Sequence, residues 1–377
     1  MKHRALVVAF IATALVFAWQ ASTVHFNYGG NWTGLFCTGA IQPVPPELDA
    51  VTIRSIHPTG YDGQMYRSIA HDPFFQRDYA QYVDDAGLRY RRILVPLAAY
   101  ALAGGRQSII DYSFVLVILI SVFAGCYWSS CYCILHGRSE WWGLVFLLVP
   151  ATITSIDRML VDGTLAALFA GFLLYTERRD WRSLLAVCTL AALTRETGIF
   201  LAAAVVLAAL LKRDFRRAVL FGSAVLPAAA WAVFVSIHTR HSTSYRITTY
   251  PLFGHLKRLL VFRHDPEPWK QSVLQVTDVV ALVGLLVCLG LAVYWILPER
   301  VREIQICVGL FVILGLVLGL PEYLFDPYGY ARPVSPLFLF LMLRGSLFGL
   351  IAPLTLTLAV GVNLVVQVAG VAKGLLR

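Results

Sequence analysis

Long, uninterrupted runs of apolar residues separated by short polar connectors dominate the chain. A helix needs about 20 apolar residues to cross a hydrocarbon core of about 30 Å. The runs are continuous rather than alternating, so they predict helices and not the strands of a barrel. We expect a retained first transmembrane helix at residues 5–23 and further spans at 108–135, 141–156, 162–176, 218–237, 277–297, 303–320, 333–343 and 346–370.

The region 183–211 has a different pattern, because basic clusters flank it on both sides and its two apolar halves are too short to cross fully. The segment TRET at 194–197 lies between the halves. We predict a hairpin of short helices whose turn carries Arg195 and Glu196 at or below the outer interface. Ionisable residues at such depth usually mark pairing or function.

The basic residues predict the orientation, because cytoplasmic loops carry an excess of Lys and Arg. One alternation of the spans places nearly every basic cluster inside: Arg138; Arg178, Arg179 and Arg182; Lys212, Arg213, Arg216 and Arg217; Arg300 and Arg302; Arg344. The outer side then holds a long first loop (24–107), the turn at 157–162, the hairpin turn, and loops at 238–276 and 321–332. The sequence predicts an all-α, polytopic bundle forming a single membrane domain, 1–377, in the cytoplasmic (inner) membrane.

Composition agrees with this assignment. Hydrophobic residues make up 58% and charged residues 14% of the chain, whereas about 25% charged is usual for soluble domains. The net charge of +9 comes from the connectors, so it does not indicate nucleic-acid binding. No glycine-rich phosphate loop is present, which argues against a nucleotide site. Only Cys37 of seven cysteines lies in a long polar loop, so no disulfide framework is expected.

The most informative string is HPTGYDGQMYRSIAHDP at 57–73. Tyr61, Met65 and Ile69 recur at helical spacing, which predicts a short interfacial helix from about 60 to 71 with its apolar face on the membrane surface. Asp62 would lie near its N-terminus, where a carboxylate can accept a proton from a hydroxyl. Alternatively, Thr59 caps the helix and Asp62 completes a capping box. The spacing of these residues alone favours the capping-box interpretation of Asp62.

A resemblance to a known family favours the interpretation of Asp62 as a catalytic base. The segment YDGQMYRSIAHDPF at 61–74 resembles the first-loop motif of bacterial multi-spanning glycosyltransferases of the GT-C superfamily, which build cell-surface glycopolymers. It is also similar to the eukaryotic mannosyltransferase family that adds the second mannose to GPI anchors. LTRETG at 193–198, the turn at 157–162 and YGYARPVSP at 328–336 resemble the same group. The resemblance implies a GT-C-like bundle, a lipid-linked sugar phosphate donor and Asp62 as catalytic base.

Two departures from the eukaryotic relatives leave the sugar and the acceptor open: Tyr61 stands where they have tryptophan, and Glu196 where they have asparagine. A site facing away from the cytoplasm cannot draw on nucleotide sugars, which also points to a polyprenyl phosphate sugar. Arginine would hold its phosphate with a fixed fork of donors. Arg195 and Arg332 are the candidates, followed by Arg54, Arg67 and Arg158.

Each candidate also has a structural interpretation. Arg195 could simply pair with Glu196 or a nearby aspartate, and Arg332 could be an interfacial anchor beside Tyr328 and Tyr330. The remaining candidates for substrate binding are Tyr61, Gln64, Tyr66, Asp157, Asp162, Glu196 and Tyr330.

The metal and surface interpretations are weaker. Asp157 and Asp162 could bind a divalent metal or orient an acceptor, or merely solvate a turn. His57, His71 and Asp72 lack the spacing of metal ligands, so no metal site is assigned. The basic run at 89–92, followed by apolar residues 93–103, predicts an interfacial helix that props the membrane surface.

We therefore expect a membrane glycosyltransferase that moves a sugar from a polyprenyl phosphate donor to a glycan or lipid-linked acceptor at the extracytoplasmic face. A transporter or lipid flippase is one alternative, and it predicts ionisable residues near the midplane of several helices. A non-catalytic subunit of a glycan-export complex is the other. In that case Asp62 and Arg195 would be replaceable without loss of turnover.

Overall fold

The computed structural model describes residues 2–55, 58–239, 250–260, 268–297, 302–318, 324, 327–362 and 364–376. Helices dominate these ranges, and within them the only β-type pairs are isolated bridges from Thr38 to Arg54 and to Gly60. The predicted all-α class is confirmed.

Four helical stretches of the described chain are long and apolar enough to cross a membrane: His3–Tyr28, Gln107–Leu135, Phe215–His238 and Ser272–Ile296. A fifth span results if α19 (Leu347–Val362) and α20 (Val365–Leu375), which meet at 62°, cross together. Large apolar side chains such as Phe10 and Leu226 are exposed on these stretches (both 64%). Exposed apolar side chains of this kind are better suited to contact with lipid than with water.

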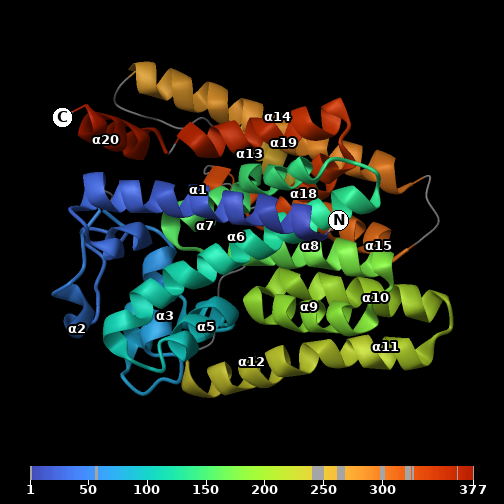
Figure 1. Ribbon diagram of the computed structural model, residues 1–377, viewed down its shortest axis with the longest axis horizontal. Coiled ribbons are helices and arrows are strands. Elements are labelled where there is room, and N and C mark those ends of the chain that lie inside the picture. The colour runs from blue at the N-terminus through green and yellow to red at the C-terminus, as the bar shows by residue number, and fades with distance from the viewer. Residues whose placement is uncertain are drawn as a thin grey trace.

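Figure 1 shows the helices running roughly parallel, with α1 (Lys2–Tyr28) crossing over α6 (Ile110–Leu135) and α8 (Asp162–Arg178). A buried hydrogen bond between Ser121 Oγ and Thr164 Oγ1, 2.8 Å apart, joins α6 to α8. On one side of this layer lie α14 (Pro268–Ile296) and α19, and on the other α11 (Phe215–Gly222) and α12 (Leu226–His238).

The predicted hairpin is confirmed. It consists of α9 (Trp181–Thr194) and α10 (Ile199–Leu211), joined by a 3-10 turn at Glu196–Gly198. A Cβ on Gly198 would lie 1.8 Å from the carbonyl oxygen of Ala191, so only glycine allows the two helices to approach this closely. Phe200 of α10 packs edge-on against Phe311 of α15 (Glu303–Val317).

Some predicted bounds were wrong. Residues 141–156 form a 3-10 helix (Glu140–Leu148) and a separate α7 (Pro150–Arg158), because Pro150 has no backbone N–H to continue a helix and instead starts one. The segment 333–343 is α18 (Ser335–Arg344). Of the loops predicted at 238–276 and 321–332, residues 240–249, 261–267, 321–323 and 325–326 lie outside the described residues. The rest contains α13 (Phe253–Leu260) and α17 (Pro327–Ala331).

The first loop folds into short helices: a 3-10 turn (Trp32–Phe36), α2 (Pro46–Asp49), α3 (Gly63–His71), α4 (Ala86–Arg89) and α5 (Leu94–Leu102). They gather at the end of the bundle where α1 finishes, here called the loop end (Figure 1). Every residue of α3 is buried. The expectation that α3 lies on the membrane surface was therefore wrong, because protein covers the helix on all sides.

Basic residues gather at the opposite end, here called the basic end. Arg138 donates to the carbonyl oxygens of Leu343 and Arg344, and Arg217 pairs with Glu303 at 2.9 Å. Clusters far apart in sequence thus meet at one end, as the predicted alternation requires.

Candidate active site

A pair of loop segments fixes the start of α3. The Gln64 side chain accepts from the backbone N–H of Gly39 at 2.9 Å and donates to the carbonyl of Thr59 at 2.8 Å. Gly60 has φ +65°, and a Cβ on it would lie 2.3 Å from the nitrogen of Gly39. Gln64, expected among the substrate-binding residues, is fully engaged in holding this loop.

At the next glycine, Gly63, α3 packs closely against the end of α7. A Cβ on Gly63 would lie 2.0 Å from the carbonyl oxygen of Arg158, at the end of α7. Asp62 is the residue before the helix, and its side chain makes no capping bond. The capping-box interpretation, with Thr59 as cap, is therefore wrong: α3 begins four residues after Thr59, and the Asp62 carboxylate is turned to other partners.

Those partners are two arginines. Arg89, the last residue of α4, donates to Oδ1 of Asp62 at 3.0 Å. Arg332, just after α17, donates to Oδ2 at 3.0 Å. Arg89 also binds Asp84 at 2.8 Å. Each carboxylate oxygen of Asp62 thus faces a fixed cation, and Asp62 and Arg332 are 270 residues apart in the sequence.

The pairing continues into the bundle. Arg332 Nη1 also lies 3.4 Å from Oδ2 of Asp162, the first residue of α8. The other oxygen of Asp162 pairs with Arg195 at the hairpin turn. Arg195 has the expected aspartate partner, while Arg332 is no plain interfacial anchor: it is buried and bridges two carboxylates.

A second branch starts at the same turn. Arg195 Nε lies 3.9 Å from Glu196, and Glu196 accepts from Arg92 Nε at 2.9 Å. Arg92 donates in turn to the hydroxyl of Tyr66, at 3.0 Å, on α3. The network therefore closes back on α3, the helix that Asp62 precedes. Its members are Asp84, Arg89, Asp62, Arg332, Asp162, Arg195, Glu196, Arg92 and Tyr66.

The charges of this network balance. Among the described residues it contains four arginines and four carboxylates. The arginines and Asp162 are almost fully buried, whereas the side chains of Asp62, Glu196 and Asp84 are 17%, 37% and 47% exposed. Three partly exposed carboxylates thus belong to the same network as four buried arginines.

Burial opposes ionisation of Asp62, but the charges of Arg89 and Arg332 outweigh it and hold the pKa of that carboxyl well below its usual range. Asp62 is therefore an anion at neutral pH. Tyr61 supplies a ring 5.1 Å from the Arg332 guanidinium, and Tyr66 one 5.9 Å from that of Arg89. Such faces orient a guanidinium. Tyr330 is buried in the adjoining α17.

The other candidates lie in separate contacts. Asp157 pairs with Arg158 at 2.8 Å, and Arg158 reaches Cys37 Sγ at 2.6 Å. Arg54 pairs with Asp49. Arg67 joins Asp111, which His71 also contacts at 3.1 Å. Within the described ranges no group of three or more His, Cys, Asp or Glu side chains could hold a metal ion. His57 lies outside the described residues.

Sequence reasoning missed Arg89, Arg92 and Asp84, because the basic run was interpreted as a membrane prop. A signal was available. Basic residues in a loop predicted to face away from the cytoplasm run against the positive-inside pattern, so local acidic partners are expected for them. Asp84 lies five residues before Arg89 and meets that need. Trp231 of α12 also donates to the carbonyl of Tyr90 at 2.7 Å, tying this run to the bundle.

Comparison of the chain with family models, curated proteins and solved structures gave no match.

Proposed function

We propose that the protein is a GT-C-type membrane glycosyltransferase, acting at the extracytoplasmic face of the cytoplasmic membrane in cell-surface glycan assembly. Its donor would be a polyprenyl phosphate sugar and its acceptor a glycan or lipid-linked glycan. The observation that carries the proposal is the partly exposed Asp62 carboxylate, held between the buried arginines Arg89 and Arg332. The motif resemblance independently assigns the base to the same residue.

The reaction would proceed by direct displacement. The acceptor hydroxyl oxygen forms a bond to C1 of the donor sugar while the bond from C1 to the phosphate oxygen breaks, and its electron pair leaves with the lipid phosphate. The hydroxyl proton passes to Asp62. The phosphate charge would be held by Arg332 and Arg195, which are buried and cannot lose their protons.

A carboxylate held by two arginines is a weak base, and this constrains the mechanism. Arg332 is shared between Asp62 and Asp162, at 3.0 and 3.4 Å. A donor phosphate that draws Arg332 toward itself would remove one of the cations that lower the pKa of Asp62. Proton affinity at Asp62 would then rise only when the donor is bound, which couples base strength to substrate.

Arg332 offers a graded test of the phosphate-binding role. We expect Arg332→Ala to raise the KM for a polyprenyl phosphate mannose donor by about tenfold or more, because a charged hydrogen bond is lost. Arg332→Lys should raise this KM less, because lysine keeps the positive charge and lacks only the forked pair of guanidinium donors. The measurement is initial rate against donor concentration in purified, detergent-solubilised protein.

The matched control is Arg77→Ala, which removes a first-loop arginine that is 40% exposed and pairs with Glu47 outside the network. It should transfer sugar with the parent's KM. Parent-like kinetics for both Arg332 variants would reduce Arg332 to a structural ion pair and would remove the phosphate role from the proposal.

A further inference from the structure

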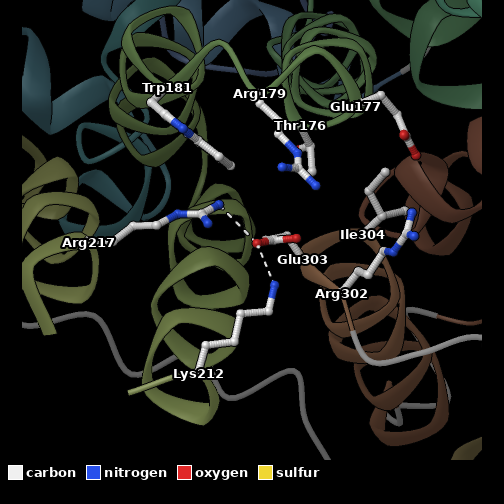
Figure 2. A pocket seen from close by; sticks show the side chains of 9 residues that line it. All are labelled: Thr176, Glu177, Arg179, Trp181, Lys212, Arg217, Arg302, Glu303 and Ile304. Atoms are coloured by element: carbon white, nitrogen blue, oxygen red, sulfur yellow. Dashed lines mark hydrogen bonds and ion pairs between the residues drawn. The ribbon is translucent and has the colours of Figure 1, made fainter. Parts of the chain in front are cut away.

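A cavity of about 320 Å³ opens at the basic end of the bundle, between α8, α9, α10, α11 and α15. It lies at the far end from Asp62, and the network of the candidate active site contributes none of its lining. Figure 2 shows side chains from these helices converging on it: Thr176, Glu177, Arg179, Trp181, Lys212, Arg217, Arg302, Glu303 and Ile304.

Glu303 organises one wall. It is the first residue of α15, where a negative charge is favoured, and its side chain is only 8% exposed. It pairs with Arg217 at 2.9 Å and with Lys212 at 3.4 Å (Figure 2). The Arg217 guanidinium also lies 3.5 Å from the ring centroid of Trp181. Ion pairing and stacking therefore fix the position of Arg217 before any ligand arrives.

Two further cations lack such partners. Arg179 and Arg302 line the same cavity, are exposed, and form no ion pair within the described part of the chain. Four cations thus face two carboxylates, Glu177 and Glu303, which leaves the lining with a net charge of +2. An anion entering the cavity would meet Arg179 and Arg302 without first breaking an existing pair.

The surroundings of the cavity are apolar. Leu211 precedes Lys212 and is 70% exposed, and Phe215 begins α11 and is 65% exposed. These side chains suit the acyl-chain boundary of a membrane. Basic pockets between transmembrane helices at the cytoplasmic side are a recurring way of binding anionic lipid headgroups.

From this cavity we infer a second binding site, independent of the proposed transferase function: a pocket for a phosphate group, engaged by Arg179, Arg302 and Lys212, with Glu303 and Trp181 orienting the wall behind them. The phosphate can belong to an anionic phospholipid headgroup or be free in solution. In the predicted orientation the pocket faces the cytoplasmic leaflet, where anionic headgroups are plentiful.

The test measures the thermal unfolding midpoint of the purified protein in neutral detergent, against increasing phosphatidylglycerol, phosphatidylcholine or inorganic phosphate. A ligand that binds only the folded state raises the midpoint, and the rise grows with the logarithm of the ligand concentration once that concentration exceeds Kd. The parent should respond to phosphatidylglycerol and not to phosphatidylcholine. The double variant Arg179→Gln with Arg302→Gln should need about tenfold more ligand or greater for the same rise, because charged hydrogen bonds are lost.

The control double variant is Arg213→Gln with Arg216→Gln, which removes two exposed arginines at the same end that do not line the cavity. It should respond like the parent. Because Arg179 and Arg302 have no ion-pair partner in the described chain, their replacement should leave the ligand-free midpoint unchanged.

A response to phosphatidylglycerol alone identifies a lipid site, and an equal response to inorganic phosphate identifies a free-phosphate site. Either result, with the variant dependence above, supports the pocket. No response in the parent, or equal responses in the two double variants, overturns it.

Discussion

Asp62→Asn should abolish sugar transfer while the protein stays folded and inserted. Asparagine has nearly the same shape, and its one carbonyl oxygen can still accept a hydrogen bond from Arg89 or Arg332, but it cannot take a proton from the acceptor. General base catalysis typically contributes about 10² to 10⁴ in rate, so a loss of that order is expected. The measurement is turnover with a saturating polyprenyl phosphate mannose donor, alongside a thermal unfolding scan.

Two parallel variants make the result specific. Asp157→Asn alters a carboxylate that pairs with Arg158, outside the network, and should keep near-parent turnover. Asp162→Asn removes a charge that Arg195 and Arg332 share, so it should lower donor use without abolishing transfer. Near-normal turnover for Asp62→Asn beside a dead Asp162 or Asp157 variant would move the base to the turn at 157–162.

Gly63→Ala is the second change with a large expected effect. Helix propensity alone would favour alanine by about 0.5–1 kcal/mol. The added methyl group would, however, lie 2.0 Å from the Arg158 carbonyl oxygen, a rigid backbone atom, so α3 must shift. A displacement of about 1 Å at a catalytic group can cost about 10²-fold in rate. We expect at least that loss, with a lower unfolding midpoint.

Gly222→Ala is the matched control. Gly222 ends α11, and nothing lies within 4 Å of a Cβ built on it. This variant should keep parent turnover and a parent or slightly higher midpoint. Equal behaviour of the two glycine variants would mean that the contact between α3 and α7 does not set the position of Asp62.

Apolar patterning predicted the helices well and their interruptions poorly. The hairpin at 183–211 followed from two short apolar halves between basic clusters, and the structure has it. The break at Pro150 was missed because residues 141–156 are apolar on both sides of it. Hydropathy registers composition, whereas the break depends on a single missing N–H.

The sequence predicted only some of the site residues. Asp62, Arg195 and Arg332 stood out as ionisable residues at the predicted outer side, and all three belong to one network. Which residues of the network pair with one another depends on long-range packing. Ser335 accepts from the backbone of Ala151 at 3.0 Å, fixing α18 against α7 and so Arg332 near Asp162. No local pattern encodes a contact across 184 residues.

Transfer of a lipid-linked sugar with Asp62 as the general base can be tested directly in cells. Mass spectrometry would compare surface glycans and polyprenyl-linked sugars in cells that make the parent protein, the Asp62→Asn variant or none. We expect the variant to match the deletion, with one sugar missing from the glycan and the polyprenyl phosphate sugar accumulating. Parent-like glycans and lipid-linked sugars in Asp62→Asn cells, with the variant present at parent levels in the membrane, would contradict it.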